Sequence, residues 1–357
     1  MNLKSLVRLS WVVMLFLPSQ SFRVSPSCWS QSLRPRACPR HGWRMQVWSN
    51  PQALEEYQDL LSGKEQVASV DTPSVIVGGG RVGEMLRGAG GGDDVVVGRG
   101  GQIPEVHEGL ESFPVYVCVP TSELENVIRS CPQSKLDDLV FVQDGMIEPI
   151  LKKYALCGNE NTQMLPYFTL FSKGGRPQDS LVDLGTDAYG EPKYAGETSI
   201  CGKWAGALKQ RLDRLNFCHR HSRTMFYRDW RRAMLEKVIF DSVFPLVGAL
   251  NKGISIGEVG QSHTEECQEM ITEIARSLPG TLAVTLMYGV EERLFAYSQH
   301  DNVEFRPCKI EQYPFRNGFW YTFSQQAKQI GFPDPTPMHS EYLELAKEKG
   351  IIDFDLH

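Results

Sequence analysis

The sequence is short of several features that would assign it to a simple class of protein. Among its nine cysteines it has no C-x-x-C pair, and it contains no internal repeat and no long low-complexity tract. A zinc site and a disulfide framework are therefore not expected, and no metal site is predicted. Because the cysteines of the body are scattered and odd in number, we expect Cys118 and Cys201 to be buried free thiols in a reducing compartment.

The first part of the chain lacks acidic residues altogether. The first acid is Glu55, whereas residues 1–50 contain seven basic ones: Lys4, Arg8, Arg23, Arg34, Arg36, Arg40 and Arg44. The whole chain carries a net charge of −6, so the part after residue 50 is more acidic than this figure suggests. An acidic body is a poor ligand for nucleic acid, and no nucleic-acid partner is expected.

The hydrophobic run near the start of the chain is short. Trp11–Leu17 follows a basic start and is too short to span a bilayer, which is the layout of a signal peptide. Residues 23–49 are rich in Arg and Ser, a composition typical of a transit peptide. A signal peptide followed by a transit peptide, with Phe22 near their junction, resembles the bipartite plastid presequence of algae with secondary plastids. We therefore expect a targeting presequence at 1–50, a lead-in segment at 51–72, and a plastid destination without stable membrane insertion after processing. Plain secretion is the alternative.

What the sequence does contain is a glycine-rich motif directly after an apolar run, Val75–Val77. Its glycines have the G-x-G-x-x-G spacing of a dinucleotide-binding turn. The first lets the strand turn sharply, the second lets backbone N–H groups approach a pyrophosphate, and the third lets the next helix pack close to the sheet. The phosphates would lie at a helix N-terminus, where negative charge is favoured. The cofactor-binding residues expected here are Gly78, Gly80, Arg81, Val82 and Gly83.

The end of the next apolar run indicates which cofactor is bound. Val95–Val97 is expected to be the second strand, and it ends about twenty residues after Gly78. An acid at that place would hold a ribose 2′-hydroxyl, whereas this chain has Arg99, which suits a 2′-phosphate. The expected cofactor is therefore NADP(H). In isolation, a solvated loop arginine explains Arg99 equally well.

Two further apolar runs, Val115–Val119 and Leu139–Val142, are predicted to be parallel strands buried on both faces. The carboxyl ends of such strands face the ligand crevice of an open α/β sheet. Pro120 and Thr121 follow the first run and Asp144 follows the second. We expect these three residues to line the nicotinamide site.

The remaining chain indicates a sheet part followed by a helical part. Residues 164–200 alternate apolar runs with turn signals and are expected to form strands or hairpins that extend the sheet, with Val182–Thr186 as one of them. From Lys203 the periodicity becomes helical. The predicted fold class is α/β, with a Rossmann-type parallel sheet domain that binds NADP at 73–202. An all-helical domain for substrate binding and dimerisation is expected at 203–357, with a homodimer formed through it.

One lysine lies in an unusually apolar helical segment, Tyr227–Leu250. Lys237 and Asp241 are four residues apart and share a face of this predicted helix. A lysine in such surroundings needs a carboxylate or a ligand as partner. A purely structural ion pair with Asp241, or a side chain that reaches out to water, is an equally good interpretation of the residues alone.

The order of these parts resembles the ketopantoate reductase family, over roughly residues 73–350. The matching pieces are the glycine motif at 78–83, Arg99, the turn 143–146, Lys237 followed by Pro245 and Gly257-Glu258, and Asn317-Gly318-Phe319. The resemblance implies reduction of a 2-oxo acid with NADPH. It implies that Lys237 donates the proton to the carbonyl oxygen, and that Glu311, give or take one residue, binds a substrate hydroxyl.

The sequence departs from the family at three places. Asp144 and Asp241 stand where the family usually has asparagine, and Pro120-Thr121 replaces a usual lysine. An ionised aspartate repels a substrate carboxylate, so a carbonyl or imine substrate that lacks this group fits better than ketopantoate. Apolar flanks would lower the pKa of Lys237 and suit it to general-acid work, whereas Asp241 would raise it, and the sequence leaves the outcome open.

Two function classes follow. The first is an NADP-dependent reductase that transfers a hydride to a small 2-oxo acid or a related carbonyl or imine, with Lys237, Glu311, Asp144 and Asp241 as catalytic residues. The second is a non-catalytic NADP(H)-binding sensor or scaffold that keeps the fold, which the three departures favour. A dehydrogenase that works in the oxidative direction differs from the first only in direction.

Overall fold

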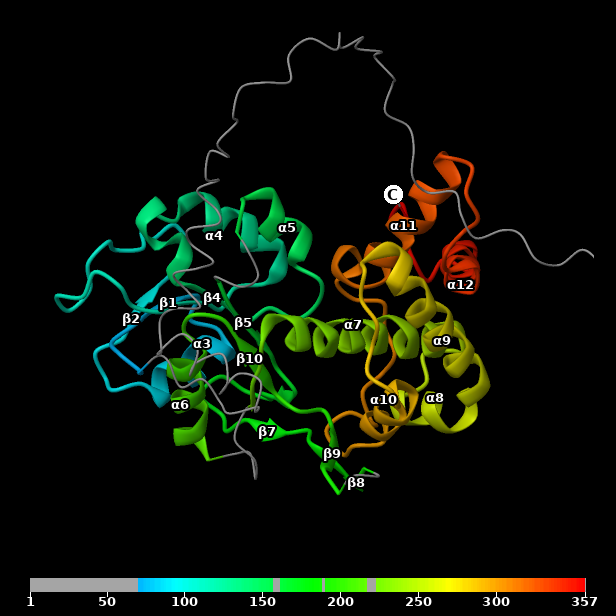
Figure 1. Cartoon of the computed structure of the whole chain (residues 1–357), viewed down its shortest axis with the longest axis horizontal. Helices are drawn as coiled ribbons and strands as arrows, with labels where there is room; N and C mark the ends of the chain where they lie inside the picture. The colour runs from blue at the N-terminus through cyan, green and yellow to red at the C-terminus, as the bar shows by residue number, and fades with distance from the viewer. Residues whose placement is uncertain (1–69, 157–160, 188–189, 217–222, 357) are drawn as a thin grey trace, which may run out of the picture. The chain divides into compact units, whose positions relative to one another are not determined.

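The computed structural model describes residues 70–156, 161–187, 190–216 and 223–356 (Figure 1). The predicted presequence at 1–50 and nearly all of the predicted lead-in segment at 51–72 lie outside these residues. Among the described residues, no helix is both long and apolar enough to cross a membrane.

The centre of the structure is a seven-stranded sheet with the order β11-β10-β5-β4-β3-β1-β2. Five of its strands are mutually parallel, and β10 runs antiparallel to β5 with β11 parallel to β10. The strands are β1 (Val75–Val77), β2 (Val95–Val97), β3 (Val115–Val117), β4 (Leu139–Phe141), β5 (Thr162–Leu165), β10 (Ser199–Cys201) and β11 (Arg223–Thr224). The predicted bounds of β1 and β2 are confirmed, and β3 and β4 end slightly earlier than expected.

Alternate residues of the central strands face two separate cores. Ile76 and Tyr116 pack with the helices α3 (Arg81–Ala89) and α6 (Ala205–Leu215). Their neighbours in the strands pack on the other face with α4 (Leu124–Ser130) and α5 (Glu148–Lys153). Figure 1 shows these two pairs of helices on opposite sides of the sheet. Because both faces are covered, β1, β3 and β4 are buried throughout, which explains their unbroken apolar sequences. The predicted α/β fold class is confirmed.

The stretch 164–200 was expected to extend the sheet, and this is only partly correct. β5 and β10 do so, but β6 (Phe168–Thr169) pairs with β7 (Gln178–Asp179) in a separate two-stranded sheet. Val182–Thr186 is a strand, β8, but among the described residues it pairs only with β9 (Pro192–Ala195), and it packs against α10 (Val290–Ser298). Several glycines of these hairpins, including Gly185 and Gly196, have a positive φ that glycine adopts at no steric cost.

The elements of the sheet continue past residue 202. Helix α6 packs on α3, and β11 pairs with β10 within the seven-stranded sheet. The mainly helical part begins with α7 (Tyr227–Leu250), whose bounds match the predicted segment. It continues with α8 (Ile256–Ser262), α9 (Thr264–Thr281), α10, α11 (Asn317–Gln329) and α12 (Pro337–Glu348).

Helix α7 connects the two parts. Its first turns pack against β5 and β10, and its later turns pack against α8, α9 and α12 (Figure 1). Because it is enclosed along most of its length, residues such as Trp230, Val243 and Phe244 are buried around the whole circumference. A polar side chain in the buried stretch of α7 is therefore held in place by what surrounds it.

Acid will weaken the helical part through one buried histidine. His339, on α12, is fully buried, and burial lowers its pKa to about 4 although Asp334 opposes this shift. In the unfolded chain its pKa is about 6.5. The unfolded state therefore binds the proton more readily, and stability present above pH 6.5 is lost as the pH falls towards 4, by about 3 kcal/mol in total. Urea unfolding measures the free energy of unfolding at pH 7 and at pH 4.5. The decrease between these two pH values should be smaller for His339→Gln than for the parent chain. Equal decreases would show that His339 is not the source of the acid sensitivity.

Candidate functional site

The glycine-rich turn has the geometry that its spacing predicts. Gly78 has φ +102°, and a Cβ on it would lie 2.6 Å from the carbonyl oxygen of Cys118 on the neighbouring strand. A Cβ on Gly83 would lie 2.0 Å from the carbonyl oxygen of Gly78, so only glycine lets α3 come this close to the turn. Around Gly80, by contrast, nothing lies within 4 Å of an added Cβ. The turn is tight where helix and sheet meet and open where a phosphate would approach.

The other residues expected at the cofactor lie around this turn. The Gly78 N–H donates to the carbonyl of Val97, so the loop that carries Arg99 begins beside the motif. Arg99 is exposed there. Val82 packs on the sheet core, and Arg81 donates from Nη1 to the carbonyl of Leu170 at 2.7 Å, which ties the loop after β6 to the N-terminus of α3.

The turns after β3 and β4 meet the helical part. Pro120 is exposed and Thr121 is buried, and the Thr121 hydroxyl lies 3.3 Å from Oε1 of Gln312. After β4, the Met146 N–H donates to the carbonyl of Phe315 at 2.8 Å. Gly145 has φ +99°, and a Cβ there would lie 3.1 Å from Phe315. Close approach of the two backbones thus explains the glycine and fixes the position of its neighbour, Asp144.

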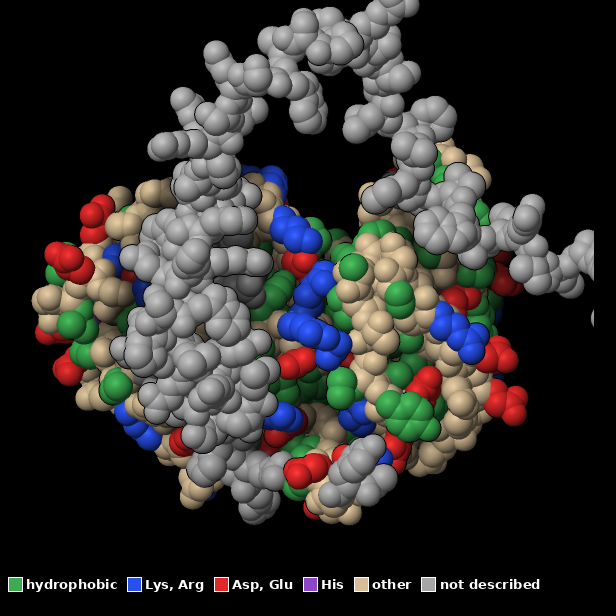
Figure 2. All heavy atoms as spheres, viewed as in Figure 1, with side chains coloured by type: hydrophobic (Ala, Val, Ile, Leu, Met, Phe, Trp, Pro, Cys, Tyr) green, Lys and Arg blue, Asp and Glu red, His purple; other side chains and the backbone are tan. Residues whose placement is uncertain are grey.

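Four charged side chains converge where these parts meet, and we call Asp144, Lys237, Asp241 and Arg316 the charge quartet. The ammonium of Lys237 lies 2.8 Å from Oδ2 of Asp241 and 3.1 Å from Oδ1 of Asp144. Nη2 of Arg316 lies 3.0 Å from Oδ2 of Asp144 and 3.8 Å from Oδ2 of Asp241. The quartet has two cations and two anions and is neutral as a unit. Figure 2 shows Lys, Arg, Asp and Glu side chains close together along the surface between the sheet part and the helical part.

Burial and the neighbouring charges shift the pKa of Lys237 in opposite directions, and the charges have the larger effect. Burial alone would lower the pKa of Lys237, but Asp144 and Asp241 together hold it above its ordinary value. The sequence left open whether the apolar flanks or Asp241 would decide the pKa of Lys237, and the carboxylates decide it because Asp144 adds to Asp241. Burial would raise the pKa of Asp144, and Lys237 and Arg316 keep it below its ordinary value. The ring of Tyr167 lies 5.4 Å from the lysine nitrogen and covers it.

Near position 311, the residue that contacts the turn after β3 is Gln312 and not Glu311. Glu311 is exposed and makes no direct contact with the quartet, although its charge raises the pKa of Arg316, against the lowering effect of burial. Its neighbour Gln312 contacts Thr121 instead. Of the predicted site residues, Lys237, Asp144 and Asp241 come together, and Glu311 lies beside them.

Sequence reasoning missed Arg316. Its partner Asp144 is 172 residues away in the chain, so no local pattern links them. The available signal was an arginine between the apolar run Tyr313–Phe315 and the Asn317-Gly318 pair, at the beginning of a helix.

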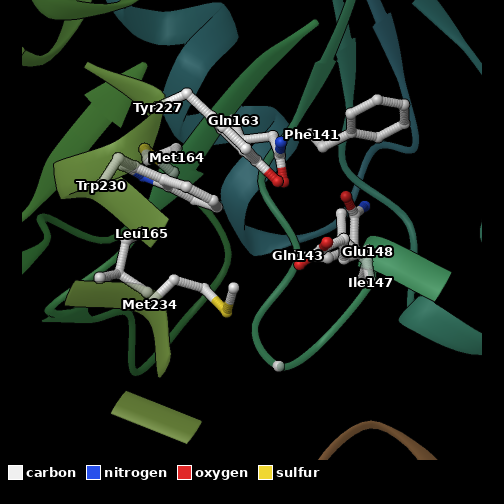
Figure 3. Close-up of a pocket in the computed structure, with 11 residues that line it drawn as sticks. Phe141, Gln143, Ile147, Glu148, Gln163, Met164, Leu165, Tyr227, Trp230 and Met234 are labelled. Carbon is white, nitrogen blue, oxygen red and sulfur yellow. The ribbon is translucent and has the colours of Figure 1, made fainter. Parts of the chain in front are cut away.

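A small pocket lies next to the quartet (Figure 3). Tyr227, Trp230 and Met234 of α7 line one side of it, and Gln143 and Glu148 line the other. It has room for about one water molecule. No member of the quartet lines it, so it does not account for these four charges.

Comparison with known proteins identifies the fold. Neither a protein-family model nor a curated protein matches this sequence. Among solved structures, D-mandelate dehydrogenase in complex with NADH is similar with 15% identity and a TM-score of 0.50, over 79% of this chain and 100% of that chain. A putative ketopantoate reductase from Ralstonia solanacearum MolK2 is similar with 14% identity and a TM-score of 0.50, over 79% and 99% of the two chains. The chain therefore shares the fold of these two structures, which is the ketopantoate reductase fold.

Proposed function

We propose that this protein is an NADP-dependent reductase that transfers a hydride to the carbonyl or imine carbon of a small molecule, 2-oxo acids being one class of such substrates. One observation carries the proposal. Lys237, from the helical part, meets Asp144, which follows β4 at the carboxyl end of the sheet. The only lysine in the quartet thus lies at the edge of the sheet where a nicotinamide would enter.

The described residues fit a dinucleotide. The tight Gly78–Gly83 turn, the open space at Gly80 and the N-terminus of the nine-residue helix α3 together suit a pyrophosphate. Arg99 would hold the ribose 2′-phosphate, and Pro120, Thr121 and Asp144 would lie along the nicotinamide. When bound, this cofactor supplies the hydride.

The residues of the chain supply position and a proton. Lys237 would donate from Nζ to a carbonyl oxygen as negative charge develops there. Asp241, one helical turn away, orients the ammonium. Since Lys237 stays charged at neutral pH, it also stabilises the developing oxyanion electrostatically. Glu311 would bind a polar group of the substrate at the rim of the site.

A second function has one observation in its favour. The ammonium of Lys237 is already paired with two carboxylates, as in a purely structural ion pair. A non-catalytic NADP(H)-binding sensor or scaffold would need nothing more. Turnover by the purified protein would exclude it.

We expect calorimetry to show NADPH binding with a clear preference over NADH. Arg99→Ala should weaken NADPH binding about tenfold and leave NADH binding unchanged, because a charge-assisted contact to the 2′-phosphate contributes about 1.5 kcal/mol or more. Arg276→Ala, at an exposed position of α9 in the helical part, is the matched control. Absence of binding by either nucleotide would refute the proposed function.

Two further proposals concern the setting of the enzyme. The composition of residues 1–50 supports delivery to a plastid, with secretion as the alternative, and the location of a fluorescent fusion of these residues tests it. A homodimer through residues 203–357 is the assembly that we propose, and sedimentation tests it.

A further inference from the structure

The charge quartet favours one class of electrophile over another. Of its four side chains, Asp144 is 30% exposed, whereas Lys237, Asp241 and Arg316 are 6%, 13% and 12% exposed. Asp144 is also the only member that comes from the sheet part. Asp144 is therefore the member of the quartet that is most accessible to a substrate.

Two atoms of the quartet have unused hydrogen-bonding capacity. Oδ1 of Asp144 is buried and accepts no hydrogen bond, because the ammonium of Lys237, 3.1 Å away, donates to Oδ2 of the same carboxylate at 3.3 Å. Nε of Arg316 is buried and donates to no group among the described residues. Buried polar atoms of this kind are costly unless a ligand satisfies them. An N–H group would satisfy Asp144, and an oxygen acceptor would satisfy Arg316.

Charge balance favours a ligand that is neutral in sum over one that carries a lone charge. The quartet is neutral, so an added carboxylate leaves a net buried negative charge next to two aspartates, which low-dielectric surroundings penalise. A protonated imine places its N–H⁺ against Asp144 instead. If it carries its own carboxylate, the ligand is neutral in sum and that group can reach Arg316.

We propose that the substrate is an imine bound in its protonated form, with Asp144 as the residue that binds its nitrogen. The inference rests on the proposed hydride-transfer function and narrows its substrate. The imine carbon accepts the hydride and a C–H bond forms, while the C=N π electron pair moves to nitrogen. The nitrogen already carries its proton and becomes a neutral amine, and the nicotinamide is oxidised by two electrons. No proton has to leave Lys237 in this step. That agrees with a lysine whose two carboxylate partners raise its pKa against the effect of burial.

The test compares an imine with a 2-oxo acid on the purified full chain with NADPH. We expect kcat/KM for 1-pyrroline to exceed that for pyruvate at least tenfold. Asp144→Asn should lower the value for 1-pyrroline at least tenfold and raise the value for pyruvate. Asp137→Asn, at an exposed position before β4, should change neither. Preference of the parent chain for pyruvate, or an equal loss of both activities in Asp144→Asn, would overturn the inference.

Binding provides a readout that does not depend on turnover. In the presence of NADP⁺, calorimetry with pyrrolidine, a cation at neutral pH, should show at least tenfold weaker binding to Asp144→Asn than to the parent chain. Unchanged affinity would refute the role of Asp144. The activity of Arg316→Gln on 1-pyrroline and on 1-pyrroline-2-carboxylate shows whether the imine carries a carboxylate. If it does, the variant should lose activity on 1-pyrroline-2-carboxylate and keep its activity on 1-pyrroline. If NADPH does not bind, the proposed function is refuted. If NADPH binds but pyruvate is the preferred substrate, only this inference is refuted.

Discussion

Replacing Lys237 by methionine will lower kcat for a carbonyl substrate by about 10²- to 10⁴-fold, the range that general-acid catalysis contributes. Methionine fills a similar volume in the apolar helix but has no proton to donate and no charge to stabilise an oxyanion. For a protonated imine, the loss should stay below about tenfold, because the nitrogen needs no proton and the variant quartet has a net negative charge that attracts a cation. The measurement is NADPH oxidation with both substrate types.

The chain offers a matched control for this variant. Lys209 is buried on α6 and pairs with Asp213 four residues later, as Lys237 pairs with Asp241. Lys209→Met should leave both rates unchanged, since this pair lies on α6, which packs on α3, β10 and β11. If Lys237→Met changes the rate with the carbonyl substrate by no more than the rate with the imine, Lys237 is not a proton donor. Loss of both activities together with a lowered unfolding temperature would show that the lysine acts through folding.

Arg211→Met will cost about 3–5 kcal/mol of unfolding free energy, the range for breaking a buried ion pair from one side. Arg211 is fully buried, and its guanidinium donates to Asp71 at 2.7 Å and to both oxygens of Asp94 at 2.7 and 2.8 Å. Asp94 also accepts from the N–H and hydroxyl of Ser74, just before β1. Removing the guanidinium leaves the buried carboxylate of Asp94 without its cation and leaves Asp71 with only the exposed Arg214.

Unfolding in guanidinium chloride, followed by circular dichroism, measures this loss of unfolding free energy, with Arg214→Met as the control. Arg214 donates to the same Asp71, but its side chain is 48% exposed. Exposed pairs contribute no more than about 1 kcal/mol, so the control variant should unfold close to the parent. Equal losses in the two variants would show that burial does not decide the strength of this cluster.

The sequence was most informative where one local pattern determines the structure. β1, β2 and α7 have the predicted bounds because continuous apolar segments bounded by turns or polar residues leave little choice of structure. The spacing of Gly78 and Gly83 likewise predicted contacts that only glycine permits. The hairpins β6–β7 and β8–β9 were less predictable, since short strands with turn signals do not reveal which strand they pair with.

The charges of the site needed the tertiary structure. Lys237 and Asp241 could be paired by their helical spacing. Asp144, however, precedes Lys237 by 93 residues, and Arg316 follows Asp144 by 172 residues. The direction of the pKa shift at Lys237 depends on Asp144 as well as Asp241. Long-range ion pairs of this kind are set by how two parts of the chain dock, which periodicity and composition do not encode.

The neutrality of the quartet also limits how the site can change over time. Exchanging Asp144 for a neutral residue leaves an excess positive charge beside α7, and losing Arg316 leaves an excess negative one. Each single change is therefore penalised until a second one restores the balance. The two aspartates and the arginine at 316 therefore form one set, and in related sequences these positions should covary.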